Sequence, residues 1–245
     1  MSRLPAALAC LVLLSACAAQ PASPGLTSLT GPLQGKVAGN IYRDKHDWVS
    51  VGIPFQHGGE LAPGVGIQEA YPANIAFVSF LSAYNPGEYY RLYAEDFFAS
   101  NHLVPDMDHV ADAVLQVYGR QLAAARNTYL AFQQEKSWRV GATQGLLRLY
   151  TQKVPTELLS LDLMQSPGLA EDYTAYILMY FTAQNGKVVM LWAEWPEDCA
   201  VCAPIPAGTP PATGADAIDR ALAMDARVRA FFDSFSYTAG ASAYQ

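Results

Sequence analysis

The chain has 245 residues, of which 51% are hydrophobic and only 15% charged, and its formal net charge is −7. This length suits one domain with tails, and the apolar fraction supplies a large core. The acidic balance argues against nucleic acid as a partner, because that binding depends on clustered Lys and Arg. It also gives no basis for attraction to anionic membrane surfaces by charge.

The N-terminus has the pattern of a secretion signal. Arg3 supplies a positive charge, and the apolar stretch Ala6 to Leu14 is too short to span a bilayer, which needs roughly 20 residues. Leu14-Ser15-Ala16-Cys17 then resembles the lipobox of bacterial lipoproteins. The resemblance implies that residues 1–16 are a signal peptide and that the thiol of Cys17 is acylated.

Acyl chains on Cys17 are expected to anchor the protein in a membrane, and more than one is needed because a single chain anchors only marginally. Ala18, rather than an Asp, follows the cysteine. By resemblance to the enterobacterial sorting rule, this favours the outer membrane, with the protein facing the periplasm. The alternative is cleavage by the ordinary signal peptidase at Ala16-Cys17-Ala18, which would release a soluble periplasmic protein.

Residues 17–36 are predicted to be the acylated cysteine and a flexible tether. The stretch is mostly Ala, Pro, Ser, Gly, Thr and Gln, so it cannot bury enough apolar surface to offset the entropy of ordering. A single domain is predicted at 37–237, followed by a disordered tail at 238–245. The first strands of the domain are expected at Val37–Arg43 and Trp48–Pro54.

A Gly- and Pro-rich segment, Phe55–Asn74, follows these strands. Structureless segments of this length are uncommon unless they bind something or are disordered. The composition predicts a surface loop, so deleting Gly58 to Gly66 is expected to leave the melting temperature nearly unchanged. Ile75–Ala83 is predicted to be the next strand.

Helices are predicted at three places. Asn85-Pro86-Gly87-Glu88 has the pattern of a helix start, with a capping Asn, Pro at the first helical position and Glu three residues after the cap. This helix is expected to run to about Ser100, and a longer one to open at Asp106 or Asp108. A terminal helix begins near Ala215, and its apolar spacing turns these residues inward: Ile218, Leu222, Val228, Phe231, Phe232 and Phe235.

The strongest local signal is a β-hairpin from Tyr173 to Trp195, after strands near 128–133 and 146–153. Asn185-Gly186 joins two apolar runs, and a type I′ turn needs φ > 0 at both of these positions. Both alternating sets of side chains in the first run are largely apolar, so the hairpin is expected mid-sheet with both faces covered. The predicted fold class is α+β: a largely antiparallel sheet with helices on both faces, an α/β/α sandwich.

The order of these elements, together with three segments, resembles the PsbP-like superfamily. The segments are Trp48-Val-Ser-Val-Gly-Ile-Pro54, Gly145-Leu-Leu-Arg-Leu-Tyr150 and Phe231-Phe-Asp-Ser-Phe235. The resemblance covers Val37 to Tyr237 and implies the α/β/α sandwich. It also implies a binding or assembly factor rather than an enzyme, and it carries over no catalytic residues.

Cys199-Ala-Val-Cys202 is the motif of the mature chain that most suggests chemistry. Of the four cysteines, Cys10 leaves with the signal and Cys17 is acylated, so Cys199 and Cys202 have only each other. In an oxidising periplasm a structural disulfide is the simpler interpretation, and two free thiols in protein purified without reductant would contradict it. The alternative is a thiol–disulfide oxidoreductase, although the prolines that follow leave no room for its helix. Metal binding or free thiols also remain open.

The rest of the sequence suggests no active site. The four histidines lack metal-ligand spacing, and serine-nucleophile and dinucleotide-loop motifs are missing. We therefore expect no metal, no cofactor and no catalysis. The sequence predicts a lipid-anchored envelope protein that binds, assembles or scaffolds, with the membrane and an envelope protein or a small ligand as partners. Its contact surface is expected on the Pro/Gly-rich loops 55–74 and 196–214.

Overall fold

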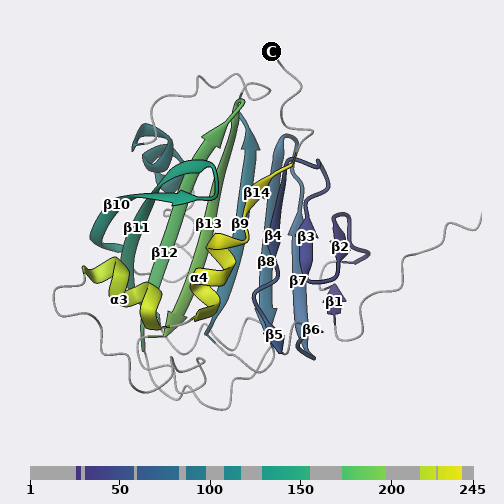
Figure 1. The fold of residues 1–245 in the computed structure, drawn as a ribbon, viewed down its shortest axis with the longest axis horizontal. Coiled ribbons are helices and arrows are strands. Elements are labelled where there is room, and N and C mark those ends of the chain that lie inside the picture. Colours follow the sequence, from purple (N-terminus) through teal and green to yellow (C-terminus); the bar gives the residue numbers. More distant parts are fainter. Residues whose placement is uncertain are drawn as a thin grey trace, which may run out of the picture.

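The structure is a computed structural model, and its helices and strands form one layered arrangement (Figure 1). The described part of the chain contains an eight-stranded, a four-stranded and a two-stranded sheet. No helix in this part is long and apolar enough to cross a membrane. The structure describes residues 26–28, 31–57, 60–82, 87–97, 108–116, 129–154, 173–196, 216–224 and 226–238.

The eight-stranded sheet has the order β1-β7-β8-β9-β13-β12-β11-β10. β1 runs parallel to β7, and the other neighbouring pairs are antiparallel. The strands are β1 (Leu26–Ser28), β7 (Val65–Ala70), β8 (Ile75–Ser82), β9 (Tyr89–Asp96), β10 (Ala131–Val140), β11 (Thr143–Val154), β12 (Tyr173–Gln184) and β13 (Lys187–Pro196).

The four-stranded sheet joins two ends of the domain. Its order is β14-β4-β3-β2, so a strand that follows the last helix pairs with one from the start of the domain. Beyond that pair, the Thr238 N–H donates to the Trp48 carbonyl at 2.9 Å. The short strands are β2 (Lys36–Ala38), β3 (Ile41–Arg43), β4 (Val49–Gly52), β14 (Ser236–Tyr237) and the separate pair β5 (Gln56–His57) and β6 (Glu60–Leu61).

The β12–β13 hairpin lies inside the large sheet, between β9 and β11. Asn185 and Gly186 have φ values of 51° and 73°, as a type I′ turn requires. All of β13 is buried, and Ile177 and Leu191 are fully buried as well. The prediction of a central hairpin covered on both faces is therefore confirmed.

The prediction that helices cover both faces of the sheet is wrong, because the described part of the chain is mostly β. One face is covered by the four-stranded sheet together with the short helices α3 (Ala217–Met224) and α4 (Ala226–Asp233) (Figure 1). Tyr42 and Val51 of the small sheet are fully buried in the same core as Leu191 of β13. The first strands of the domain, which were predicted to belong to one sheet with the hairpin, thus form a separate layer that covers it.

On the opposite face, the described cover is a short helix at residues 108–116. Its Val110 and Val114 pack against apolar residues of β9, β11, β12 and β13. Arg148 of β11 binds Asp112 of this helix at 2.6 Å. The inward residues predicted for the terminal helix are all buried, but they are divided between α3, α4 and the turn that follows.

The helix predicted after Asn85 is also wrong, because residues 89–96 form strand β9. Tyr90 packs in the core shared with α4, while Tyr93 packs in the core on the opposite face of the sheet. Side chains on both faces of this strand are therefore buried. β9 pairs with β8 on one side and β13 on the other. Its aromatic residues suit a central strand, and this tertiary pairing overrides the local capping signal.

The segment Phe55–Asn74 is not a surface loop. It contains β5, β6 and β7, and β7 pairs with both β1 and β8. Val65 and Ile67 are fully buried in the core. Deleting Gly58 to Gly66 removes Val65 and breaks this pairing, so we now expect loss of the cooperative thermal transition in circular dichroism. A near wild-type melting temperature would contradict the placement of β7.

One buried carboxylate fixes the start of the domain to the large sheet. Glu69 of β7 accepts hydrogen bonds from the backbone N–H groups of Gln34 (2.7 Å) and Gly35 (2.9 Å) and from the Tyr42 hydroxyl. The Tyr71 hydroxyl lies 2.5 Å from that of Tyr42. Burial raises the pKa of both tyrosines, so both stay protonated and able to donate. We call these five residues the Glu69 clasp.

Candidate functional site

A groove of about 420 Å³ lies between α4 and the strands β3 and β4 of the small sheet. This volume is within the range of about 300–1,000 Å³ that is typical of small-molecule sites. We call it the α4 groove. It is lined by Asn40, Ile41, Gly52, Ile53, Pro54, Gln56, Ala226, Arg227, Ala230, Phe231 and Ser234.

The groove is open because small residues face it from both sides. Ala226 and Ala230 are four residues apart on α4, so they share one face of the helix. Gly52 stands on the strand side and has no side chain. Behind these residues, Ile53 and Phe231 are buried in the core and form an apolar wall. A longer side chain at either alanine would occupy the space.

The distance between α4 and β4 is set by Gly52 and Ser234. The Gly52 N–H donates to Ser234 Oγ at 2.8 Å, and that hydroxyl donates to the Phe231 carbonyl at 2.7 Å. A Cβ at Gly52 would lie 3.0 Å from the Ser234 side chain, so a larger residue here would require Ser234 to shift by a few tenths of an ångström. One end of the groove is therefore closed by a fixed contact between helix and strand.

The mouth of the groove carries two amide side chains. Asn40 Nδ2 donates to Gln56 Oε1 at 2.7 Å, and Gln56 Nε2 donates to the Ile53 carbonyl at 2.7 Å. Ile41, next to Asn40, is 39% exposed and is one of the few large apolar side chains at the described surface. The mouth thus offers polar groups beside an exposed apolar residue, a combination typical of ligand sites.

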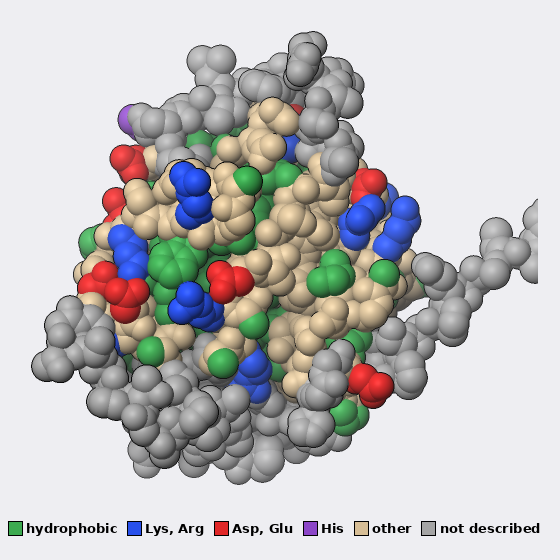
Figure 2. Space-filling model, viewed as in Figure 1, with side chains coloured by type: hydrophobic (Ala, Val, Ile, Leu, Met, Phe, Trp, Pro, Cys, Tyr) green, Lys and Arg blue, Asp and Glu red, His purple; other side chains and the backbone are tan. Residues whose placement is uncertain are grey.

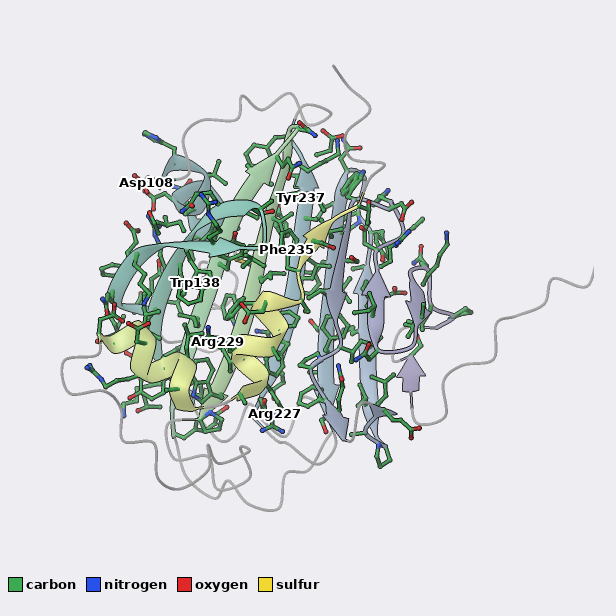
Figure 3. The ribbon with its side chains drawn as sticks, viewed as in Figure 1. Asp108, Trp138, Arg227, Arg229, Phe235 and Tyr237 are labelled. Atoms are coloured by element: carbon green, nitrogen blue, oxygen red, sulfur yellow. The ribbon has the colours of Figure 1, made fainter. Side chains whose placement is uncertain are left out.

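Of the described residues that line the groove, one is charged. Arg227 is at the N-terminal end of α4, far from Phe235 and Tyr237 (Figure 3). Its terminal nitrogen lies 3.0 Å from an oxygen of Glu88, whose side chain is 0% exposed against 18% for Arg227. Glu88 also accepts a hydrogen bond from the Tyr90 hydroxyl. The ion pair therefore ties α4 to the start of β9.

On the described surface around α3 and α4, charges of a single sign form no patch. Figure 2 views this side, and acidic and basic side chains are scattered over it. Several are paired, such as Arg229 with Asp233 at 3.4 Å and Lys136 with Asp219 at 2.5 Å. This distribution does not suit binding to a polyanion, which needs clustered basic groups.

The α4 groove is not the site that the sequence predicts. Cys17, Cys199 and Cys202 are outside the described residues, as is the loop 196–214 except for its first residue. The segment 55–74 is largely strand, and only Gln56 of that segment lines the groove. Among the described residues, His, Cys, Asp and Glu side chains form no group that could hold a metal ion.

Sequence reasoning missed the groove because its residues come from separate segments. Asn40, Gln56 and Arg227 are polar residues with no motif around them. The terminal helix was predicted with its apolar face inward, but Ala226 and Ala230 lie beside that face rather than on it. A pair of alanines four residues apart at the edge of an apolar helix face was the only local signal.

Comparisons with known proteins find a distant structural likeness and no family. No protein family and no curated protein matches the sequence. Among solved structures, the chain is similar to cyanobacterial PsbP (CyanoP) from Synechocystis sp. PCC 6803, with 13% identity and a TM-score of 0.41. The match covers 66% of this chain and 84% of CyanoP. A likeness this distant carries no inference about fold or function.

Proposed function

We propose that the protein is a non-enzymatic binding protein of the bacterial cell envelope, and that the α4 groove is its site for a small ligand. The observation that supports binding is the groove itself. It combines a volume suited to a small molecule, apolar walls from Ile53 and Phe231, and amide groups at its mouth.

The groove is built on regular elements rather than on loops alone. Its helix side is held by Phe231, which packs against Phe80 and Tyr90 of the large sheet with ring centroids 6.1 and 5.1 Å apart. Its strand side is held by the pairing of β4 with β3 and β14. A site on fixed elements loses little conformational freedom when a ligand binds, and this raises its affinity.

Filling the groove tests this proposal. The neutral apolar dye N-phenyl-1-naphthylamine is titrated into wild-type protein, Ala230→Trp and the control Ala223→Trp, whose exposed position is on α3. We expect saturable fluorescence in the wild type and the control, and about tenfold weaker binding or none in Ala230→Trp, because indole occupies the groove. Wild-type protein without saturable binding, or equal binding by Ala230→Trp, would contradict the proposal.

We further propose that acyl chains on Cys17 hold the protein at the outer membrane, facing the periplasm. This proposal is supported by the lipobox Leu14-Ser15-Ala16-Cys17 and by Ala18 after it. An anchor of two or three chains gives stable attachment where one chain does not. Cys199 and Cys202 are proposed to form a structural disulfide, as their spacing and an oxidising compartment favour.

Replacing the acylated cysteine should detach the protein. In Cys17→Ser the lipid cannot be attached, because serine has no thiol. Cleavage by the ordinary signal peptidase after Ala18 is then expected to release the chain into the soluble fraction after cell fractionation. Cys10→Ser is the matched control, since residue 10 lies in the signal peptide, and it should stay in the membrane fraction. A mature wild-type chain with an unmodified N-terminus at Ala19, read by intact mass spectrometry, would contradict the anchor.

A further inference from the structure

β10 forms a long open edge of the large sheet. It is 10 residues long and ends the strand order, so β11 is its only neighbour in the described sheet. On this strand Glu135, Ser137 and Arg139 are exposed. A strand in this position presents a row of backbone N–H and C=O groups without partners, and these can pair with another strand.

The turn after β10 shows which backbone groups point to the open edge. Val140 lies opposite Thr143, and Gly141 has a φ of 56°, as at the first position of a two-residue type II′ turn. Such a turn closes on a hydrogen-bonded pair, and these pairs alternate along an antiparallel ladder. The even-numbered residues of 136–140 therefore bond to β11, while the odd-numbered residues of 135–139 direct their N–H and C=O groups to the open edge.

The side chains of this strand carry charges that are not balanced within one chain. Glu135 and Asp112 both bind Arg148, at 2.5 and 2.6 Å, so these three residues have one negative charge in excess. Arg139 lies on the same face of the strand as Glu135 and has no ion pair with any described residue. Four residues of extended chain separate the two by about 13 Å, so they cannot neutralise each other.

A second copy of β10 brings these charges together. When two β10 strands pair antiparallel about a two-fold axis at Ser137, Glu135 of each copy lies opposite Arg139 of the other. The Cβ atoms of opposite residues are about 4.5–5.5 Å apart, which allows an ion pair. An axis at Glu135 or Lys136 places like charges opposite each other, and an axis at Trp138 gives the arginines no acid. Charge complementarity therefore selects the register centred on Ser137.

We propose that the protein forms a two-fold dimer in which β10 pairs with β10 of a second copy and joins the two large sheets. This surface is separate from the α4 groove, so the dimer does not depend on the proposed ligand. Regular pairing is limited to the residues after the bulge between Phe132 and Gln134. So short a ladder gives a small interface, and the dimer is expected to dissociate on dilution.

Cysteine cross-linking of the purified protein in mild detergent tests the register. Ser137→Cys places two thiols at the axis, where the Cα atoms are about 5.5 Å apart, a separation that a disulfide can bridge. Gln133→Cys is the matched control, because residue 133 is neutral and exposed on the same strand but lies about 26 Å from its copy in the dimer.

With copper–phenanthroline as oxidant, we expect at least tenfold more covalent dimer from Ser137→Cys than from Gln133→Cys, and the yield should fall on dilution. The wild type measures the background from the natural cysteines. Equal yields from the two variants, or a yield from Ser137→Cys no higher than that of the wild type, would overturn the dimer.

A charge reversal tests the ion pairs across the axis. In Ser137→Cys/Arg139→Glu, acid faces acid at both ends of the interface, so the yield of covalent dimer should fall about tenfold, and most strongly at low salt. Ser137→Cys/Arg43→Glu makes the same change of net charge on β3, where Arg43 is half exposed, and should keep its yield. Equal yields from these two double variants would overturn the pairing of Glu135 with Arg139.

Discussion

Phe231→Ala is expected to destabilise the domain by about 3–5 kcal/mol, the range for a buried aromatic cut back to alanine. Phe231 is 1% exposed, and its ring contacts those of Phe80, Tyr90 and Phe232. Removing it leaves a cavity where α4 meets the large sheet, and the pairing of β4 with β14 prevents full collapse. Urea unfolding followed by tryptophan fluorescence measures the loss as a lower midpoint with an unchanged slope.

Phe132→Ala is the control for this substitution, because it removes the same atoms from an exposed site. Phe132 is 58% exposed on the edge strand β10 and has one ring contact, with Tyr150. Its loss should cost less than about 1 kcal/mol. Similar midpoints for the two variants would mean that α4 does not pack on the sheet as described, and the wall of the groove would then be lost.

Glu69→Ala should be the second most damaging change, with a loss of about 3 kcal/mol or more. The substitution leaves the N–H groups of Gln34 and Gly35 and the hydroxyl of Tyr42 without their shared acceptor. Tyr42 is fully buried, and a buried donor without a partner costs about 1–3 kcal/mol. The two backbone N–H groups are in part-buried contacts and add less, because water can reach them. In Glu69→Ala the backbone amides of Gln34 and Gly35 should exchange hydrogen faster than in the wild type, and faster than the amides of the core strands.

Glu60→Ala provides the comparison for Glu69→Ala, since Glu60 is an exposed carboxylate on β6 with no described role in the core. Its unfolding midpoint should match that of the wild type within about 0.5 kcal/mol. If Glu69→Ala also unfolds like the wild type and protects the two amides equally well, the clasp does not fix the start of the domain.

The central hairpin could be predicted because its information is local. Asn185 and Gly186 adopt positive φ at the tip, and the flanking apolar runs place Ile177 and Leu191 in the interior. Burial of both faces of the hairpin could also be predicted, because neither set of alternating side chains is polar. The turn residues and the alternation of the side chains both indicate a buried hairpin here, and this prediction was confirmed.

The layers could not be predicted, because they depend on contacts between distant segments. Val49 and Val51 read as a strand, and they form one, but no local feature shows that this strand pairs with residues 236–237 instead of the hairpin. At β9 the capping pattern before Tyr89 pointed to a helix, and pairing with β8 and β13 prevailed. Tertiary pairing of this kind routinely overrides local propensity.

The candidate site shows the same limit more strongly. The sequence predicted a contact surface on two Pro/Gly-rich segments, one of which carries two cysteines. The groove is instead open because Gly52, Ala226 and Ala230 have small side chains or none. Arg227 had no partner visible in the sequence, because Glu88 is far away along the chain. A hollow between two elements is a property of their packing, and only the folded structure displays it.

The claim that the α4 groove is the ligand site is tested most directly by mapping backbone amide shifts in two-dimensional NMR during titration with N-phenyl-1-naphthylamine. The account predicts that the amides of Gly52, Ala226, Ala230 and Ser234 shift together and saturably, while Phe132 and the rest of β10 stay unchanged. Saturable shifts centred on another surface, with those four amides unmoved, would contradict it.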